Sequence, residues 1–140
     1  MPLITDLRDD IKKYIKKHGL SKKWEKANIE NQLQVRKMIK RILKELKIEL
    51  QDIYGDQLKG LYLYGSYARE EADGESDIDI LIILDKIKRY SYEIARTSDL
   101  VAELSLKYDT TISRVFVSQQ DWADKETPFL LSTRKEAIAA

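Results

Sequence analysis

Two short stretches of the sequence carry residue types that suit a phosphorylated substrate and a metal ion. The first is Gly65-Ser66, and the second is the pair Asp77 and Asp79, which are separated by one residue. On a β-strand, residues two positions apart point to the same side, so the two carboxylates would lie about 6.5 Å apart. Two such charges repel each other, and a bound Mg²⁺, which prefers oxygen ligands, relieves the repulsion. The alternative interpretation is a solvated strand end with two surface acids.

Gly65 and Ser66 lie at a predicted junction between a strand and a short helix over residues 66–71. Glycine lets the backbone approach a ligand closely, and the free N–H groups of a helix N-terminus bind phosphate. The alternative is an ordinary N-cap serine after a turn glycine. Combined with the acidic pair, the two residues predict a phosphate-binding turn beside a metal site, the arrangement used for phosphoryl or nucleotidyl transfer. Arg69 would either reach a phosphate or form a surface ion pair with a neighbouring glutamate.

The surrounding sequence predicts the elements that would position these residues. Helices are expected over residues 4–19, 29–54 and 87–107, strands over 61–64, 77–84 and 111–117, and then a short helical turn, a break at Pro128 and a helix-prone tail. The longest helix follows from an apolar stripe with steps of three and four residues, made of Val35, Ile39, Ile42, Leu46, Leu50 and Ile53. This order predicts an α/β (α+β) fold, in which a small mixed β-sheet is flanked by helices.

The composition excludes several classes of site. The 140-residue chain has no cysteine, which rules out disulfides, thiol catalysis and cysteine zinc sites, and His18 is its only histidine. Chemistry must therefore come from carboxylates, hydroxyls, basic side chains or backbone groups. No apolar run approaches the length of a membrane span, and the charged N-terminus lacks an apolar signal core. We therefore expect a cytoplasmic protein that does not contact a membrane.

The net charge of +1 hides an uneven distribution. Residues 1–50 contain 14 Lys or Arg and 7 Asp or Glu, whereas the rest of the chain is acidic. Such asymmetry indicates a basic face for nucleic acid or an acidic partner, or else helix surfaces that are merely solvated. We expect residues 1–28 to form a basic helical extension that docks a partner, and residues 29–140 to form the main domain.

The central motif resembles that of the nucleotidyltransferase superfamily that includes DNA polymerase β, and in particular its minimal nucleotidyltransferases, the MNT group. The family motif is Gly-Ser, a short spacer and Asp-x-Asp, and here ten residues separate Ser66 from Asp77. The flanking residues also agree, with Tyr-Ala-Arg after Gly-Ser and Ser-Asp-Ile-Asp-Ile-Leu at the second strand. The order of elements extends the resemblance over roughly residues 29–130. We therefore expect a nucleotidyltransferase domain within residues 29–140.

The resemblance implies roles for the motif residues. Asp77 and Asp79 would hold Mg²⁺ and the triphosphate of ATP or another nucleotide, and they are the expected catalytic pair. Gly65 and Ser66 would hold the phosphates, with Arg69 as a further candidate for nucleotide binding.

In the family, a third carboxylate on a later strand usually completes a two-metal site and activates the attacking hydroxyl. The corresponding position in the strand over residues 111–117 is Ser113, and the nearest acid is Asp109, in the preceding turn. A serine cannot supply the charge that a second metal needs. Catalysis would then be weak, use one metal, draw Asp109 or a substrate group into the site, or be absent.

The resemblance also implies a partner protein. MNT proteins commonly pair with a HEPN-type RNase toxin and act as its antitoxin by attaching AMP to it. We therefore expect a Mg²⁺-dependent protein adenylyltransferase that uses ATP. The alternative is a catalytically degenerate nucleotidyltransferase fold that neutralises or regulates its partner by complex formation. Contact with nucleic acid through the basic N-terminal half is a further hypothesis.

Overall fold

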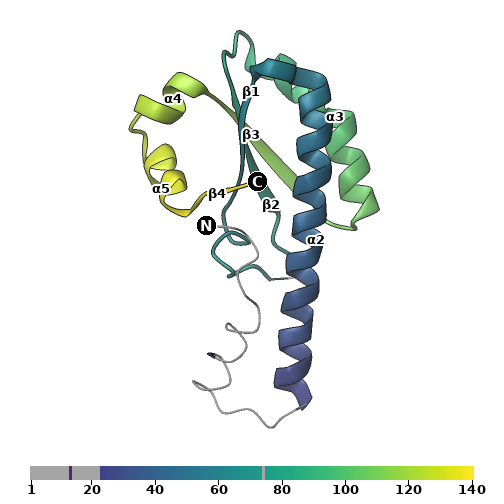
Figure 1. Ribbon diagram of the computed structural model, residues 1–140. Helices are drawn as coiled ribbons and strands as arrows, with labels where there is room; N and C mark the ends of the chain where they lie inside the picture. Colours follow the sequence, from purple (N-terminus) through teal and green to yellow (C-terminus); the bar gives the residue numbers. More distant parts are fainter. Residues whose placement is uncertain (1–12, 14–22, 74) are drawn as a thin grey trace.

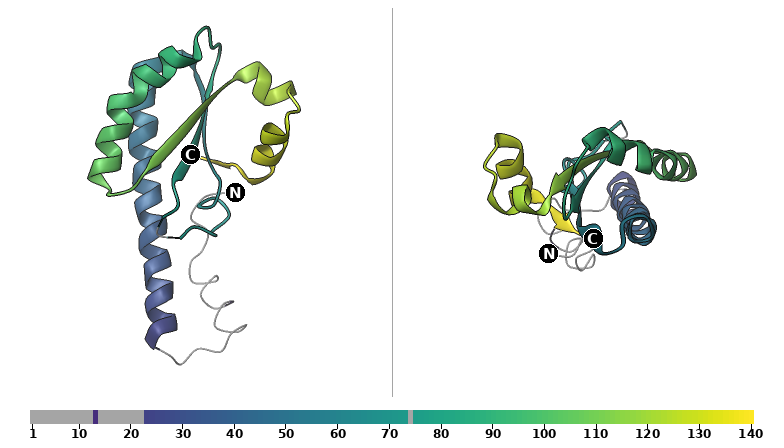
Figure 2. Two further views of the ribbon diagram at one scale, coloured as in Figure 1. Left: turned by 180° about the vertical axis from the view of Figure 1, so that it is seen from behind. Right: turned by 90° about the horizontal axis from the view of Figure 1, so that it is seen from above.

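The computed structural model describes residues 13, 23–73 and 75–140, and within them a four-stranded sheet lies between two layers of helices (Figures 1 and 2). The elements are α2 (Lys23–Tyr54), the 3-10 turn η1 (Gly55–Gln57), β1 (Leu58–Tyr64), β2 (Ile78–Leu84), α3 (Tyr90–Lys107), β3 (Ile112–Ser118), α4 (Gln119–Asp124), α5 (Pro128–Glu136) and β4 (Ile138–Ala139). The predicted fold class, a small mixed sheet flanked by helices, is confirmed. The helix expected over residues 4–19 lies outside the described residues, apart from Lys13.

Helix α2 packs along the sheet through the apolar stripe seen in the sequence. Ile39, Ile42, Leu46 and Leu50 are each at most 2% exposed. The helix begins at Lys23, earlier than predicted, so the expected boundary after residue 28 falls inside it. It ends at Tyr54 because Gly55 takes a left-handed conformation with φ of +55°, which glycine adopts without steric cost.

The sheet has the strand order β3-β2-β1-β4, with β2 in its interior. Every residue of β2 except Asp79 is buried, as its nearly unbroken apolar sequence predicts. β2 pairs antiparallel with β1 and parallel with β3, and α3 makes the crossover that a parallel pair requires. The one polar position of β2 therefore lies where the strand begins, close to the end of β1.

The two faces of the sheet are covered by different helices, as the view from above shows (Figure 2). Residues such as Ile80 and Phe116 belong to the core shared with α2 and α3. Leu81 and Ile83 belong to a second, smaller core with Leu130 of α5. Because side chains alternate along a strand, Asp79 lies on the same face as Leu81, the face that α4 and α5 cover.

The C-terminal segment differs from the sequence expectation. Pro128 does not interrupt structure but opens α5, where its missing N–H costs nothing, and Thr127 caps the helix by accepting the N–H of Leu130. Beyond α5, the short strand β4 was not predicted, and it pairs antiparallel with β1. Among the described residues, no helix combines the length and apolar character needed to cross a membrane.

Candidate functional site

The site is built around the turn that follows β1. At Gly65 the backbone adopts φ of +77°, a conformation that favours glycine. A Cβ at this position would lie 3.1 Å from Cγ of Asp79 and closer still to its Oδ2. Glycine is therefore required here for two reasons, because the conformation is left-handed and because the Asp79 carboxylate fills the space of a side chain.

Residues 66–71 form a sequence of turns and not the predicted short helix. The N–H of Arg69 donates to the carbonyl of Gly65 at 3.1 Å, and the N–H of Glu71 donates to the carbonyl of Ser66 at 2.9 Å. Glu70 has φ of +59°, which is incompatible with a continuing right-handed helix. The helix N-terminus that was expected to bind phosphate is thus replaced by a tight loop.

This loop still presents backbone donors. Within the described part of the chain, the N–H groups of Ser66, Tyr67 and Ala68 have no hydrogen-bond acceptor. Successive backbone N–H groups in a turn form a concavity that binds anions. The loop therefore offers the donors that a phosphate group needs, without a helix dipole.

The two acidic residues differ in their surroundings. Asp77 is exposed just before β2, whereas Asp79 is partly buried within it. Burial raises the pKa of the Asp79 carboxyl, and the Asp77 carboxylate raises it further; Arg69 acts in the opposite direction, and Glu136 in the same direction as Asp77. An ionised Asp79 is therefore unfavourable in the ligand-free protein, and a cation would offset this cost.

The oxygen ligands present fit Mg²⁺ only in part. Asp77 and Asp79 supply carboxylate oxygens, which Mg²⁺ prefers. Among residues 13, 23–73 and 75–140, however, no three His, Cys, Asp or Glu side chains gather into a metal-binding group. A cation here would take its remaining ligands from water and from the phosphate oxygens of a nucleotide, as Mg²⁺ usually does.

The strand register places Ser113 beside Asp79. Asp79 pairs with Tyr64 of β1 on one side and with Ser113 of β3 on the other, so the three side chains form a row on one face. Burial, followed by the charge of Asp79, raises the pKa of Tyr64 to about 12, so its hydroxyl stays protonated at neutral pH. Asp109 lies in the turn between α3 and β3, with φ of +49°.

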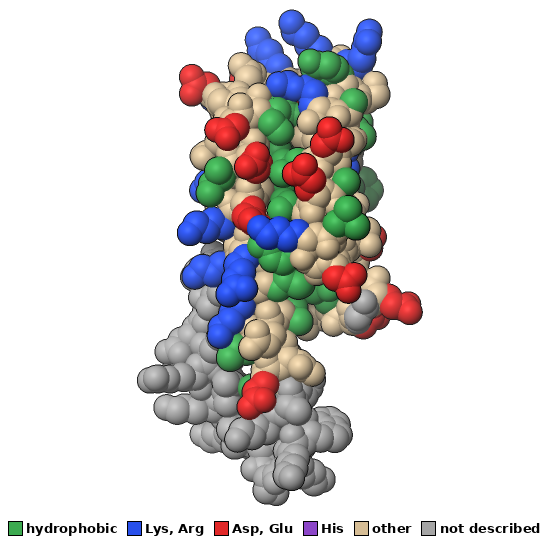
Figure 3. All heavy atoms as spheres, turned by 90° about the vertical axis from the view of Figure 1, so that its right-hand side faces the viewer, with side chains coloured by type: hydrophobic (Ala, Val, Ile, Leu, Met, Phe, Trp, Pro, Cys, Tyr) green, Lys and Arg blue, Asp and Glu red, His purple; other side chains and the backbone are tan. Residues whose placement is uncertain are grey.

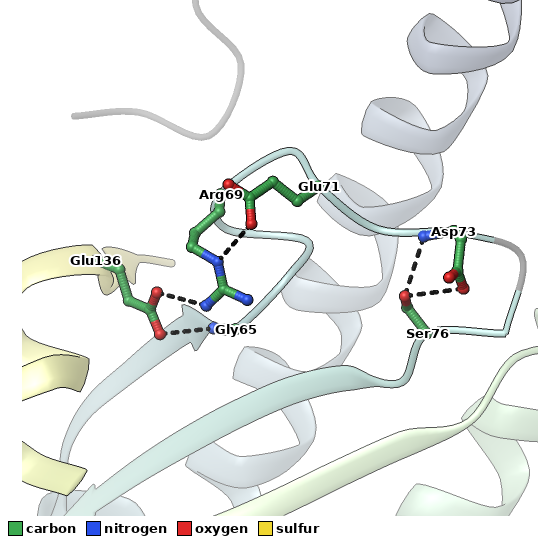
Figure 4. Close-up of polar contacts among 6 residues, drawn as sticks. All are labelled: Gly65, Arg69, Glu71, Asp73, Ser76 and Glu136. Carbon is green, nitrogen blue, oxygen red and sulfur yellow. Dashed lines mark hydrogen bonds and ion pairs between the residues drawn. The ribbon is translucent and has the colours of Figure 1, made fainter.

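Arg69 forms ion pairs, which was one of the two predicted roles (Figure 4). Its guanidinium lies 3.0 Å from a carboxylate oxygen of Glu71 and 2.7 Å from one of Glu136. The other oxygen of Glu136 accepts the N–H of Gly65 at 3.2 Å. Sequence reasoning missed Glu136, because it lies 71 positions from Gly65 and no local pattern marks it.

Comparisons with known proteins show which family the chain resembles. The family model described as "Nucleotidyltransferase domain" matches residues 39–127. "Putative protein adenylyltransferase MJ0141" of Methanocaldococcus jannaschii is 38% identical over 74 residues, 53% of this chain and 74% of that protein. "Putative protein adenylyltransferase MJ1305" of the same organism is 35% identical over 88 residues, 61% of this chain and 58% of that protein. A crystal structure of a toxin-antitoxin with AMP-PNP aligns with a TM-score of 0.47 and 20% identity, covering 66% of this chain and 67% of the other.

Proposed function

The chain belongs to the nucleotidyltransferase domain family, and we propose that it transfers AMP from ATP to a hydroxyl group of a partner protein, with Mg²⁺. The observation that carries the proposal is the fit of Gly65 against Asp79, which brings the phosphate-binding turn and the acidic pair together. The names of the curated relatives, which specify protein adenylyltransferases, support a protein as the acceptor.

The proposed reaction is a substitution at the α-phosphorus of ATP. The acceptor oxygen bonds to that phosphorus, the bond between the α- and β-phosphates breaks, and pyrophosphate and the hydroxyl proton are released. The N–H groups of Ser66, Tyr67 and Ala68 would bind phosphate oxygens and hold the triphosphate in place. A metal ion held by Asp77 and Asp79 would neutralise charge on the phosphates.

The partner that we propose is a HEPN-type RNase toxin, for which this chain would serve as the antitoxin. This rests on the Gly-Ser and Asp-x-Asp spacing typical of the MNT group. The exposed face of α2 is the proposed docking surface, since Lys37, Lys40 and Lys44 are exposed and follow one another at helical spacing. Figure 3 shows basic side chains gathered along one edge of this side of the molecule. In the described residues, none of these three lysines forms an ion pair. Nucleic acid binding by the same face is the competing outcome.

A second candidate function is regulation by complex formation without catalysis. Ser113 favours this alternative, because the strand register places a neutral hydroxyl beside Asp79 where the family has a carboxylate. A site with two acids holds one nucleotide-bound cation more readily than two, so binding can persist where transfer is weak.

One experiment separates the two functions. The chain is incubated with Mg²⁺, ATP labelled at the α-phosphate and the protein encoded beside it, and label on the partner is measured together with the partner's RNase activity. Transfer predicts labelled partner and released pyrophosphate, both lost in Asp77→Asn/Asp79→Asn and retained in Asp99→Asn, an exposed acid on α3. Silencing of the partner without label would support the binding function, and no effect on the partner would contradict both.

A further inference from the structure

The Glu136 carboxylate accepts hydrogen bonds from two donors that a bound phosphate would use. Its carboxylate accepts the Gly65 N–H at 3.2 Å and the Arg69 guanidinium at 2.7 Å, with only 19% of the side chain exposed (Figure 4). The N–H groups of Ser66, Tyr67 and Ala68, which follow Gly65, have no acceptor in the described structure. One end of the row of donors is therefore occupied by a protein carboxylate, and the rest is open.

The charges around Arg69 also indicate that Glu136 occupies a position suited to phosphate. The guanidinium is shared by Glu136 and Glu71, so its positive charge is already balanced by two carboxylates. An incoming phosphate would meet the negative Glu136 before it met a free cation. Because like charges repel at short range, a nucleotide and the Glu136 carboxylate cannot both occupy these donors.

We propose that Glu136 holds the place of a phosphate group in the ligand-free site, and that the triphosphate of a nucleotide displaces it from Gly65 and Arg69. Carboxylate and phosphate oxygens accept hydrogen bonds from the same charged and backbone donors. When Glu136 is displaced, Arg69 is free to bind phosphate, so the guanidinium exchanges a carboxylate for a phosphate. The inference rests on the proposed function, since it requires that the site bind a nucleotide.

The test compares the affinity of Mg-ATP for wild type, Glu136→Gln and Glu71→Gln by titration calorimetry. Glu136→Gln should bind Mg-ATP roughly tenfold more tightly than wild type, because the nucleotide no longer has to break the charge-assisted bond between Arg69 and the Glu136 carboxylate. Glu71→Gln is the comparison: Glu71 also pairs with Arg69 but makes no bond to Gly65, so its gain should be clearly smaller than that of Glu136→Gln. Asp99→Asn, which replaces an exposed acid on α3, is the control whose affinity should not change. Inorganic triphosphate should show the same gain, and adenosine should show none.

Equal or weaker binding by Glu136→Gln, with wild type still binding Mg-ATP, would overturn the inference and leave the proposed function standing. Glu136 would then brace the loop instead of competing with phosphate. If neither protein binds, the proposed function fails as well. A second measurement needs no variant: in wild type, inorganic triphosphate should shift the amide resonance of Gly65 and the Nη1–H resonance of Arg69 together, since both groups donate to Glu136. Unmoved resonances at saturation would also overturn the inference.

Discussion

The Cβ that Gly65 lacks would fall on the carboxylate of Asp79, so the first residue of the loop and the acid of the central strand share one space. The loop that we propose binds phosphate and the acid of β2 are thus in direct steric contact. A side chain added at position 65 must therefore displace the Asp79 carboxylate.

Gly65→Ala should therefore impair both stability and function. The left-handed backbone costs about 1 kcal/mol for a residue with a Cβ, and the new methyl group must push the Asp79 carboxylate aside. We expect AMP transfer to fall by about 100-fold, because small misplacements of reacting groups are costly. Gly55→Ala is a matched control, since Gly55 also has positive φ but nothing lies within 4 Å of its Cβ position. Unfolding in denaturant and Mg-ATP titration of both variants check the prediction, and a similar loss of binding in both would contradict it.

Asp79→Asn should stabilise the protein when no nucleotide is present, although it abolishes Mg-ATP binding. The pKa of Asp79 is raised in the folded state, so the ionised carboxylate is less favourable there than in the unfolded chain. Asp79 therefore destabilises the folded protein least at a pH below its pKa in the unfolded chain. The free energy of unfolding falls as the pH rises through its pKa in the folded protein. Thermal unfolding at neutral and acidic pH should show a gain for the variant that shrinks in acid. Asp99→Asn, which replaces an exposed acid on α3, is the control variant.

Ser113→Asp should raise the rate of AMP transfer. The new carboxylate would lie beside Asp79 in the strand register and supply the acid that the site lacks. We expect a gain of about tenfold or more in single-turnover rate, which is below the roughly 100-fold that a well-positioned acid or base contributes. The same charge should lower stability without nucleotide. Ser113→Ala and Asp109→Asn are the comparisons: a fast wild type inactivated by Asp109→Asn would identify Asp109 as the third acid instead.

A chain that starts at Asn28 should fold and bind Mg-ATP but bind its partner more weakly, because it keeps the proposed docking surface on α2 and loses the basic N-terminal segment. The closely buried stripe of α2 begins at Ile39, so the shortened chain keeps all of it. The truncation removes eight of the 14 Lys and Arg residues that lie within residues 1–50. Circular dichroism, Mg-ATP titration and partner binding are measured on the same preparation. An unfolded product would place the N-terminal segment in the core and contradict the docking role.

The sequence predicted those parts of the site that depend on local patterns. The apolar run after Asp79 marks a buried strand, and alternation along β3 places Ser113 on the face of Asp79. The predicted helix over residues 66–71 was wrong because Glu70 takes a left-handed conformation, which a right-handed helix cannot contain. Length alone does not explain the error, since α4 is a helix of six residues.

The contribution of the C-terminal segment could not be predicted in this way. Glu136 reaches Gly65 only because α5 folds over the sheet and β4 pairs with β1. Such contacts depend on the packing of distant elements, and neither hydropathy nor spacing around residue 136 signals them. Pro128 was misjudged for a related reason: proline breaks a helix interior but suits the first helical position, and only the cap at Thr127 distinguishes the two.

The contact between Glu136 and Gly65 also closes a long stretch of chain, since 71 positions separate the two residues. Such a contact repays the entropy of loop closure only when the elements between its ends are already packed. We therefore expect the Gly65 N–H to gain its acceptor late in folding, after β1 and β2 have paired, and to lose it again by local opening while the sheet stays intact.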